Sequence, residues 1–208
     1  LMSRYPCPVD EMDEKAESDI LELVQRQTTL NFRPGTDFNY CNTGYLLLAV
    51  AVRRVCGASF RDRVEKRVFQ PLGMAASRIR DDHTELLNGR ARGYTPGAGG
   101  RASYYVPNFD FAGSTSVYTT AEDLLRWAGN VIHPRLGGAR VVARLTTPGA
   151  LNDGRSTHYG AGLEIGAYRG LEVVKHRGWD LGYSAHLVIY PGERFAGVAA
   201  IEVFDCHQ

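Results

Sequence analysis

The sequence of 208 residues carries a formal net charge of +1, and 44% of its residues are hydrophobic. This length allows a substantial buried core, while the charge balance gives no basic excess for binding nucleic acid and no acidic tail. No apolar run approaches the roughly 18 residues that span a bilayer, and the first residues show no signal-peptide pattern. We therefore expect a globular protein that binds neither nucleic acid nor a membrane.

The first predicted helix follows a polar stretch without periodicity, residues 1–17. Ser18 fits an N-cap before a short amphipathic helix at 19–27. Pro34 and Gly35 then mark a turn in the loop that follows this helix.

Two further helices are predicted over 44–57 and 60–74. The first is apolar nearly all round, so it is expected to be buried, and Gly57 is a natural end for it. Ser59 fits the N-cap of the second helix, which Pro71 is expected to end.

The middle of the chain, residues 77–117, is rich in Gly, Asp, Arg and Tyr and only weakly periodic. A segment of this kind inside a domain usually carries function or insertions rather than core. Within it, the sequence DDHTE at 81–85 is interpreted as a solvated loop. A helix is predicted over 119–132, where Thr119 and Glu122 have the spacing of a capping box.

The C-terminal part changes to short segments that are rich in β-branched and aromatic residues and are separated by turn-forming residues. These segments are residues 158–168, 170–178, 183–191 and 194–203. Short links between successive strands favour an antiparallel meander. Helices followed by an antiparallel sheet predict a single α+β domain, with helices and loops over 1–150 and the sheet over 151–208.

The four cysteines show no CxxC spacing, which favours reduced thiols over disulfides or a metal site. They are Cys7, Cys41, Cys56 and Cys206. His176 and His186 could face each other across a hairpin, but no third ligand follows at a suitable spacing. We expect no metal and no cofactor.

Four stretches are informative when they are taken together and in order. They are RPGTDFNYCNTGYLLLA (33–49), VFQPLGM (68–74), VYTTAEDLLRW (117–127) and KHRGWDLGYSAHLVIYP (175–191). These stretches resemble the serine β-lactamase and penicillin-binding-protein-like family, in its esterase and D-peptidase branch. The first resembles the family's Pro-Gly loop and Tyr-x-Asn motif, and the last resembles its Lys/His-x-Gly strand. The resemblance implies an antiparallel sheet flanked by helices, and a serine nucleophile that forms an acyl-enzyme.

The resemblance also implies a role for each matching residue. Tyr40 would be the base or proton relay, and Asn42 would orient the lysine of the nucleophile motif and the substrate. His176 and Gly178 would belong to the strand that forms one wall of the cleft, and the backbone N–H of Trp179 would be half of the oxyanion hole. The implied substrates are small esters, amides or peptides.

A histidine stands in the strand motif, where a lysine would supply a permanent charge. A tyrosine with a reference pKa near 10 needs nearby cations before its phenolate can accept a proton at neutral pH. His176, with a reference pKa near 6.5, is charged only part of the time. We therefore expect weaker activation of Tyr40 than in a β-lactam specialist, a pH optimum that depends on His176, and ester or peptide substrates.

Two features depart from the family pattern. No serine in the 208 residues has a lysine three positions later, so the sequence contains no Ser-x-x-Lys nucleophile motif. Family members carry this motif upstream, with two N-terminal strands and a helix, and we expect the chain to lack these elements and the C-terminal helix that follows the last strand. In the second departure, Arg177 stands at a position that is usually small, where it could narrow the cleft or grip a substrate carboxylate.

The absent first strand would pair with the last strand of the sheet. Its absence leaves residues 194–203 with an exposed apolar edge. We therefore expect the isolated chain to be inactive, and to associate either with its missing N-terminal segment or with another copy of itself through this edge.

Other interpretations stay open at this point. Tyr40 and Asn42 could simply begin the helix, with Asn42 or Thr43 as its N-cap. His176 could be a satisfied core or surface histidine, and Arg177 an exposed charge. The chain could also be a non-catalytic binding or regulatory homologue with the same fold, or a product truncated or frame-shifted at its start.

Overall fold

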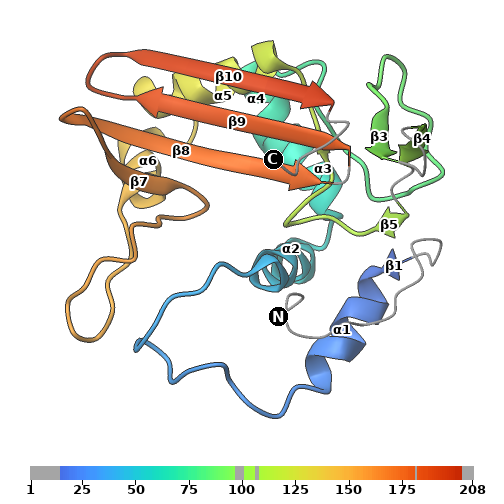
Figure 1. Ribbon diagram of the computed structural model, residues 1–208, viewed down its shortest axis with the longest axis horizontal. Coiled ribbons are helices and arrows are strands. Elements are labelled where there is room, and N and C mark those ends of the chain that lie inside the picture. The colour runs from blue at the N-terminus through green and yellow to red at the C-terminus, as the bar shows by residue number, and fades with distance from the viewer. Residues whose placement is uncertain (1–14, 97–100, 106–107, 181, 203–208) are drawn as a thin grey trace.

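The computed structural model of the chain describes residues 15–96, 101–105, 108–180 and 182–202. Four antiparallel strands form the main sheet, in the spatial order β10-β9-β8-β7 (Figure 1). They are β7 (Glu164–Tyr168), β8 (Leu171–Asp180), β9 (Tyr183–Tyr190) and β10 (Phe195–Glu202). The predicted antiparallel meander of an α+β fold is confirmed.

The turns of the sheet follow from the residues between its strands. Arg169 and Gly170 join β7 to β8 with φ of 51° and 83°, and a two-residue type I′ turn needs positive φ at both positions. In the next hairpin, the register of β8 and β9 places Val174 opposite Ile189. Because side chains alternate between the faces of a strand, this pairing puts both apolar side chains on the same face.

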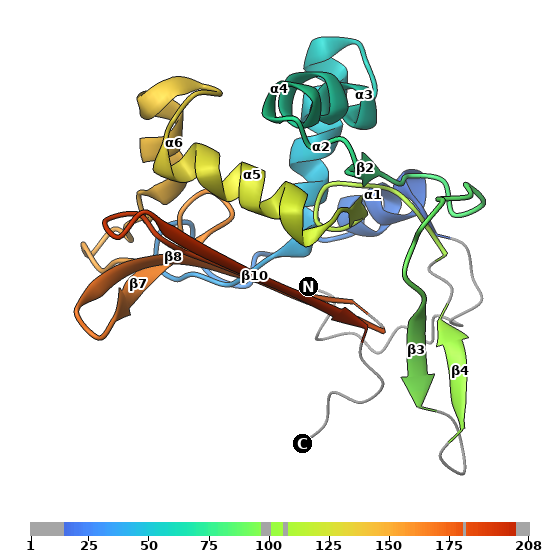
Figure 2. The same ribbon diagram turned by 90° about the horizontal axis from the view of Figure 1, so that it is seen from above.

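Two helices, α5 (Ala121–Ile132) and α6 (Gly138–Thr146), cover that face of the sheet, as Figure 2 shows. Val174, Ile189 and Ala128 of α5 are fully buried between the layers, with 0% exposure. Sequence patterning misses α6, because its N-cap and its first residue are both glycines. The N-cap, Gly137, has a left-handed conformation. The main core therefore lies between the sheet and these two helices.

The start of α5 is tied to the middle of the chain by a buried carboxylate. Its N-cap is Thr120, whose hydroxyl accepts from the N–H of Asp123 at 3.2 Å. The cap therefore lies one residue after Thr119, the predicted position. Asp123 is 1% exposed, and its Oδ2 accepts from the Ser77 hydroxyl at 2.8 Å and from the Ala76 N–H at 2.9 Å. A buried carboxylate with several donors is stable only while those bonds are kept.

Helix α1 (Glu17–Gln25) begins two residues before its predicted start. Its N-cap is Ala16, whose N–H donates to the Asp19 carboxylate at 2.8 Å. Ser18 therefore lies inside the helix and is not the N-cap, because a carboxylate in the first turn satisfies the free N–H instead.

Helix α2 (Asn42–Cys56) is present as predicted and ends at Gly57, which has a φ of 61°. Its predicted burial is wrong. Leu46 is 2% exposed, whereas Leu48 is 59% exposed and Val55 is 86% exposed. The apolar stripe that includes Leu46 packs against α1 and Phe111, and the described elements leave the opposite stripe uncovered.

The predicted helix at 60–74 is divided into three parts. These are α3 (Phe60–Val64), a π-helical turn η1 (Glu65–Phe69) and α4 (Gln70–Leu72). Ser59 is confirmed as the N-cap, since its hydroxyl accepts from the N–H of Asp62 at 2.9 Å. Pro71 lies inside α4, and the helix ends at Gly73 with a φ of 69°. The wider π turn lies where the proline ring would clash with the preceding turn of an α-helix.

The segment 77–117 contains short strands between its loops. They are β2 (Arg78–Ile79), β3 (Gly93–Pro96), β4 (Ala102–Tyr105), β5 (Phe109–Asp110) and β6 (Val117–Tyr118), and β5 pairs with β1 (Lys15–Ala16). The loop at 81–85 is more than a solvated segment, because Asp81 and Glu85 form ion pairs with Arg61 at 3.4 Å and 2.6 Å. These ion pairs fasten the loop to α3.

In the described part of the chain, β10 pairs with β9 alone and is an edge strand. Ile201 on this strand is 60% exposed. Figure 2 shows no described helix on the sheet face opposite α5 and α6. Within the described residues, the sheet therefore presents both an open edge and an open face.

Cys41 and Cys56 are free thiols, as predicted, while Cys7 and Cys206 lie outside the described residues. Among the residues that the structure describes, no single helix is both long enough and apolar enough to cross a bilayer. The segments 42–56 and 60–72 reach that length and composition only together, with a bend of 82° between them.

Candidate active site

A cleft opens between the end of β8, the start of α2 and the loop at 113–117. Its volume is about 2330 Å³, larger than the pockets of a few hundred to about 1,000 Å³ that hold small ligands. The cleft therefore has room for a peptide-sized ligand or for further polypeptide. Tyr40, Asn42 and His176 all line it.

A glycine lets the loop at 113–117 lie directly on α2. Gly113 has a φ of 137°, and a Cβ at this position would lie 2.8 Å from the carbonyl oxygen of Tyr45 and 3.0 Å from the Cβ of Ala49. Any other residue would push the loop away from the helix, so this glycine fixes one side of the cleft.

Tyr40 and Asn42 lie at the entrance to α2, and neither of them caps it. The N-cap is Cys41, whose side chain makes no capping hydrogen bond, and Asn42 is the first helical residue. The interpretation that Asn42 or Thr43 serves as the N-cap is therefore wrong. The Asn42 side chain makes no hydrogen bond with any described residue, so its carboxamide is available to a ligand in the cleft.

His176 stands where β8 loses one of its two neighbours. The pairing of β7 with β8 ends at Glu164 and Lys175, and from His176 to Asp180 the described structure pairs β8 only with β9. The centroid of the His176 ring lies 6.1 Å from that of Tyr40, with the ring planes inclined at 37°. The structure thus brings together two residues that are far apart in the sequence.

The three residues after His176 also line the cleft, but the side chains of Arg177 and Trp179 point to the opposite face of β8 from that of His176. Arg177 is exposed, and Trp179 is 63% exposed. A Cβ added at Gly178 would meet only ordinary contact, with the Cβ of Ala185 at 3.9 Å. Packing among the described residues therefore does not demand a glycine at this position.

His186 does not share the cleft with His176. The strand register pairs His186 with Arg177, and His176 with Leu187. Residues that are offset by one position point to opposite faces of a sheet. The suggestion that the two histidines face each other is therefore wrong.

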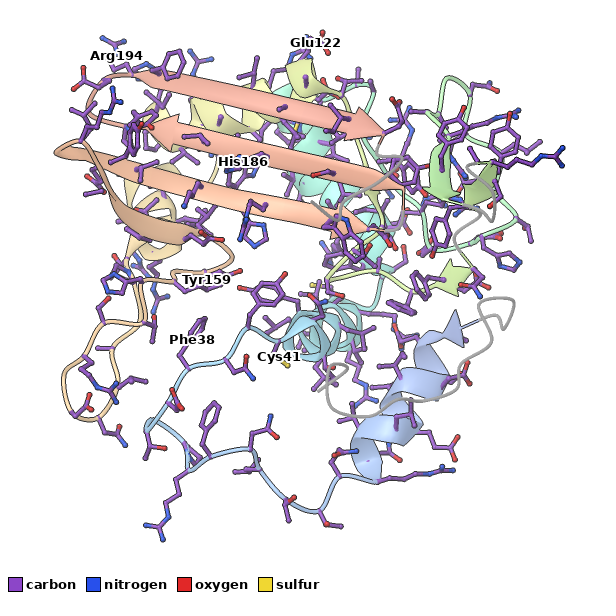
Figure 3. The ribbon with its side chains drawn as sticks, in the orientation of Figure 1. Phe38, Cys41, Glu122, Tyr159, His186 and Arg194 are labelled. Atoms are coloured by element: carbon purple, nitrogen blue, oxygen red, sulfur yellow. The ribbon has the colours of Figure 1, made fainter. Side chains whose placement is uncertain are left out.

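Sequence reasoning missed Tyr159, which lies in the segment between α6 and β7. Its hydroxyl oxygen is 3.0 Å from Nε2 of His176. Its ring lies 5.5 Å from the ring of Phe38 and 6.0 Å from that of Tyr40, between centroids. Figure 3 shows Tyr159 and Phe38 on neighbouring segments below β8, with Cys41 at the start of α2. The one local signal is a tyrosine followed by the closely spaced glycines of YGAG, just before a strand.

The surroundings of Tyr40 favour the neutral phenol. Burial, reinforced by Tyr45, raises the pKa of Tyr40 above its ordinary value. Burial also raises the pKa of Tyr159, with Tyr45 and Tyr40 adding to the effect. None of the cation–π contacts among the described residues involves Tyr40 or Tyr159. A phenolate at Tyr40 would therefore need a positive charge nearby.

One group of side chains in the described structure has the composition of a metal site. It consists of Asp82, His83 and Asp110, whose ligand atoms all lie within 4.8 Å of one another. Nδ1 of His83 already lies 2.9 Å from Oδ1 of Asp110, as in an ion pair or hydrogen bond. The group does not include His176, so it is separate from the Tyr40 site.

Comparison with known proteins now identifies the family of the chain. A family model described as Beta-lactamase matches residues 4–204. The chain belongs to the β-lactamase family. Tyr40, Asn42 and His176 of this β-lactamase-family chain all line one cleft, and their catalytic roles stay a prediction.

Relatives narrow the branch of the β-lactamase family. The chain is 25% identical over 186 residues to a D-aminopeptidase of Gluconobacter oxydans, a match that covers 89% of this chain and 35% of that protein. The chain thus spans about a third of the length of the curated relatives that it matches.

Solved structures agree with the family assignment. A penicillin binding protein from Bacillus halodurans matches with a TM-score of 0.81 and 27% identity, over 96% of this chain and 62% of that one. A D-amino acid amidase from Ochrobactrum anthropi matches with a TM-score of 0.73 and 20% identity, over 92% of this chain and 58% of that one. The second likeness concerns the fold alone.

Proposed function

We propose that this chain forms one wall of the active site of a serine hydrolase that cleaves amides or peptides through an acyl-enzyme. The observation that carries the proposal is the convergence of Tyr40 and His176, with ring centroids 6.1 Å apart, in the cleft that Asn42 also lines. Because the Asn42 carboxamide takes no part in capping α2, it is available to orient a substrate.

In the proposed mechanism, Tyr40 carries a proton. The oxygen of a serine attacks the substrate carbonyl carbon while its proton passes to the Tyr40 phenolate. The amine leaves with that proton as the C–N bond breaks, and water then hydrolyses the ester bond of the acyl-enzyme. The backbone N–H of Trp179 would stabilise the oxyanion.

The nucleophile would lie on polypeptide outside these 208 residues. Two observations support this arrangement. Burial raises the pKa of Tyr40, and a cation such as the lysine of a Ser-x-x-Lys motif would favour its phenolate. The described residues leave the apolar side of α2 that includes Leu48 and Val55 uncovered, and a helix carrying that motif would bury it.

The substrate class that we propose is an amide or short peptide of a D-amino acid. Its support is the identity of 25% to a D-aminopeptidase, together with the size of the cleft. Arg177 is exposed beside this cleft, and we propose that it binds a substrate carboxylate. Arg177→Ala would then raise KM for a dipeptide with a free carboxylate and leave KM for the matching amide unchanged.

The test compares the 208-residue chain with a longer form that adds the upstream coding sequence. Both are incubated with the p-nitroanilides of D-alanine and L-alanine, with p-nitrophenyl acetate and with nitrocefin. The proposal predicts that only the longer form hydrolyses the D-alanine substrate, and that it prefers this substrate to the L-alanine one. Turnover by the short chain, or an inactive longer form without a Ser-x-x-Lys motif, would overturn the proposal. The second result would indicate a non-catalytic homologue.

A further inference from the structure

The segment that carries Tyr159 is held in place through its backbone. The carbonyl oxygen of Tyr159 accepts from the N–H of Gly149 at 2.9 Å and from the hydroxyl of Thr157 at 3.0 Å. The preceding residue, His158, has a φ of 54°, which residues other than glycine rarely adopt. A strained conformation of this kind persists only where the surroundings enforce it, and such residues concentrate at functional sites.

The ring of Tyr159 is also fixed, by aromatic neighbours from two parts of the chain. Phe38 lies 5.5 Å away between ring centroids, and Tyr40 contacts it edge-on at 6.0 Å with an interplanar angle of 83°. The His176 ring lies 6.1 Å away at 69°. Edge-to-face packing at these distances is favourable, so the ring has one well-defined orientation.

This orientation delivers the Tyr159 hydroxyl to one particular atom. The hydroxyl oxygen lies 3.0 Å from Nε2 of His176, which is hydrogen-bonding distance. Burial raises the pKa of Tyr159, so its hydroxyl keeps its proton across the neutral pH range. With Nε2 engaged, Nδ1 is the ring nitrogen of His176 that remains for a ligand.

A histidine in the strand motif needs such a partner more than a lysine would. The two ring nitrogens of imidazole are not equivalent, and the hydrogen bond made by one of them sets which one carries the proton. A ring without a fixed partner would also rotate about its Cβ–Cγ bond. Sites that depend on a histidine usually restrain its second nitrogen in this way.

We propose that Tyr159 is a positioning residue for His176. The Tyr159 hydroxyl hydrogen-bonds to Nε2, fixes the orientation of the ring, and leaves Nδ1 to meet a substrate in the cleft. The part that concerns a substrate rests on the function proposed above. The part that concerns the ring of His176 is a property of the 208-residue chain alone.

The direct test observes the imidazole nitrogens of the 15N-labelled 208-residue chain by NMR. Tyr159→Phe removes only the hydroxyl and keeps the ring, and the loss of signals in His176→Gln assigns the resonances of His176. We expect the Nδ1 and Nε2 shifts of His176 to move in Tyr159→Phe, because Nε2 loses its hydrogen-bond partner and the ring loses its fixed orientation. Tyr190→Phe, on β9 and packed against Phe195, is the control and should leave them unchanged. Unchanged His176 shifts in a folded Tyr159→Phe chain would overturn the proposal.

Activity of the longer form separates this proposal from the proposed function. Loss of a group that orients a functional histidine is expected to lower kcat about 10–100-fold. If the NMR shifts move but the longer form shows no hydrolysis, the positioning role of Tyr159 stands and the proposed function fails. If the longer form is active and Tyr159→Phe retains its kcat, the positioning role is overturned.

Discussion

The sheet region and the α2 region differ in how completely their apolar surfaces are covered. Val174 and Ile189 of the sheet are fully buried, because α5 and α6 lie directly on them. On α2, Leu46 is 2% exposed but Leu48, two positions later, is 59% exposed. Among the described residues, one face of the sheet is therefore fully covered, while α2 is packed on one side only.

The largest loss of stability is expected in the sheet region. Ile189→Ala should lower the free energy of unfolding by about 2–5 kcal/mol, because it removes a fully buried side chain and leaves a cavity. Ile201→Ala on the neighbouring strand is the same chemical change at a side chain that is 60% exposed. It should lower the free energy of unfolding by less than about 0.5 kcal/mol. Urea unfolding followed by circular dichroism measures both values. Equal losses would show that the sheet core is not where the structure places it.

A corresponding pair of substitutions on α2 compares a buried leucine with an exposed one. Leu46→Ala should cost about 2–3 kcal/mol, at the lower end of the range because a helix covered on one side can relax into the cavity. Leu48→Ala should cost less than about 0.5 kcal/mol in the 208-residue chain. In the longer form, a covering segment would raise the cost of Leu48→Ala to that of a buried leucine. An unchanged small cost in the longer form would argue against such a segment.

The open edge of the sheet is expected to mediate self-association of the isolated chain. Ile201→Lys places a charge on the edge strand β10 and should weaken association about 10-fold, or about 1.4 kcal/mol. Leu48→Lys is the matched control on α2 and should have a smaller effect. Sedimentation equilibrium measures both. A larger effect of Leu48→Lys would identify α2 as the contact surface. A monomeric wild-type chain would contradict the prediction of self-association.

The smallest expected effect is a pH dependence from the loop at 81–85. A hydrogen bond from Arg61 lowers the pKa of Glu85 in the folded state. The stabilisation is therefore complete above the unfolded-state pKa of about 4.3, and it is lost as the pH falls through the lower folded-state value. Glu85→Gln should reduce the fall in stability between pH 5 and pH 3 by less than about 1 kcal/mol. Glu193→Gln, an exposed residue without a described ion pair, should leave that fall unchanged.

The strands and helix ends that sequence reasoning predicted correctly are those with local signals. Gly170 marks a hairpin turn because glycine readily adopts positive φ, and Gly57 ends α2 for the same reason. The burial of α2 could not be predicted in this way. An all-round apolar pattern shows that a helix favours burial, but which stripe is covered depends on elements elsewhere in the chain.

The candidate site was predicted in part. Tyr40, Asn42 and His176 belong to motifs with recognisable spacing, and the structure brings all three to one cleft. Tyr159 carried no such signal, because it lies in an irregular segment whose conformation is set by contacts with Gly149 and Thr157. A long-range contact of one hydroxyl with one ring nitrogen leaves no periodic trace in a sequence.

The most direct test of the proposed active site is kcat for D-alanine p-nitroanilide, measured in the longer form with and without the Tyr40 hydroxyl. Loss of a proton carrier lowers kcat by about 10²–10⁴-fold, so Tyr40→Phe should show a fall in that range while KM changes little. Tyr168→Phe, an exposed tyrosine on β7, is the control and should keep the wild-type kcat. An active longer form in which Tyr40→Phe retains the wild-type kcat would contradict the role of Tyr40 and with it the proposed site.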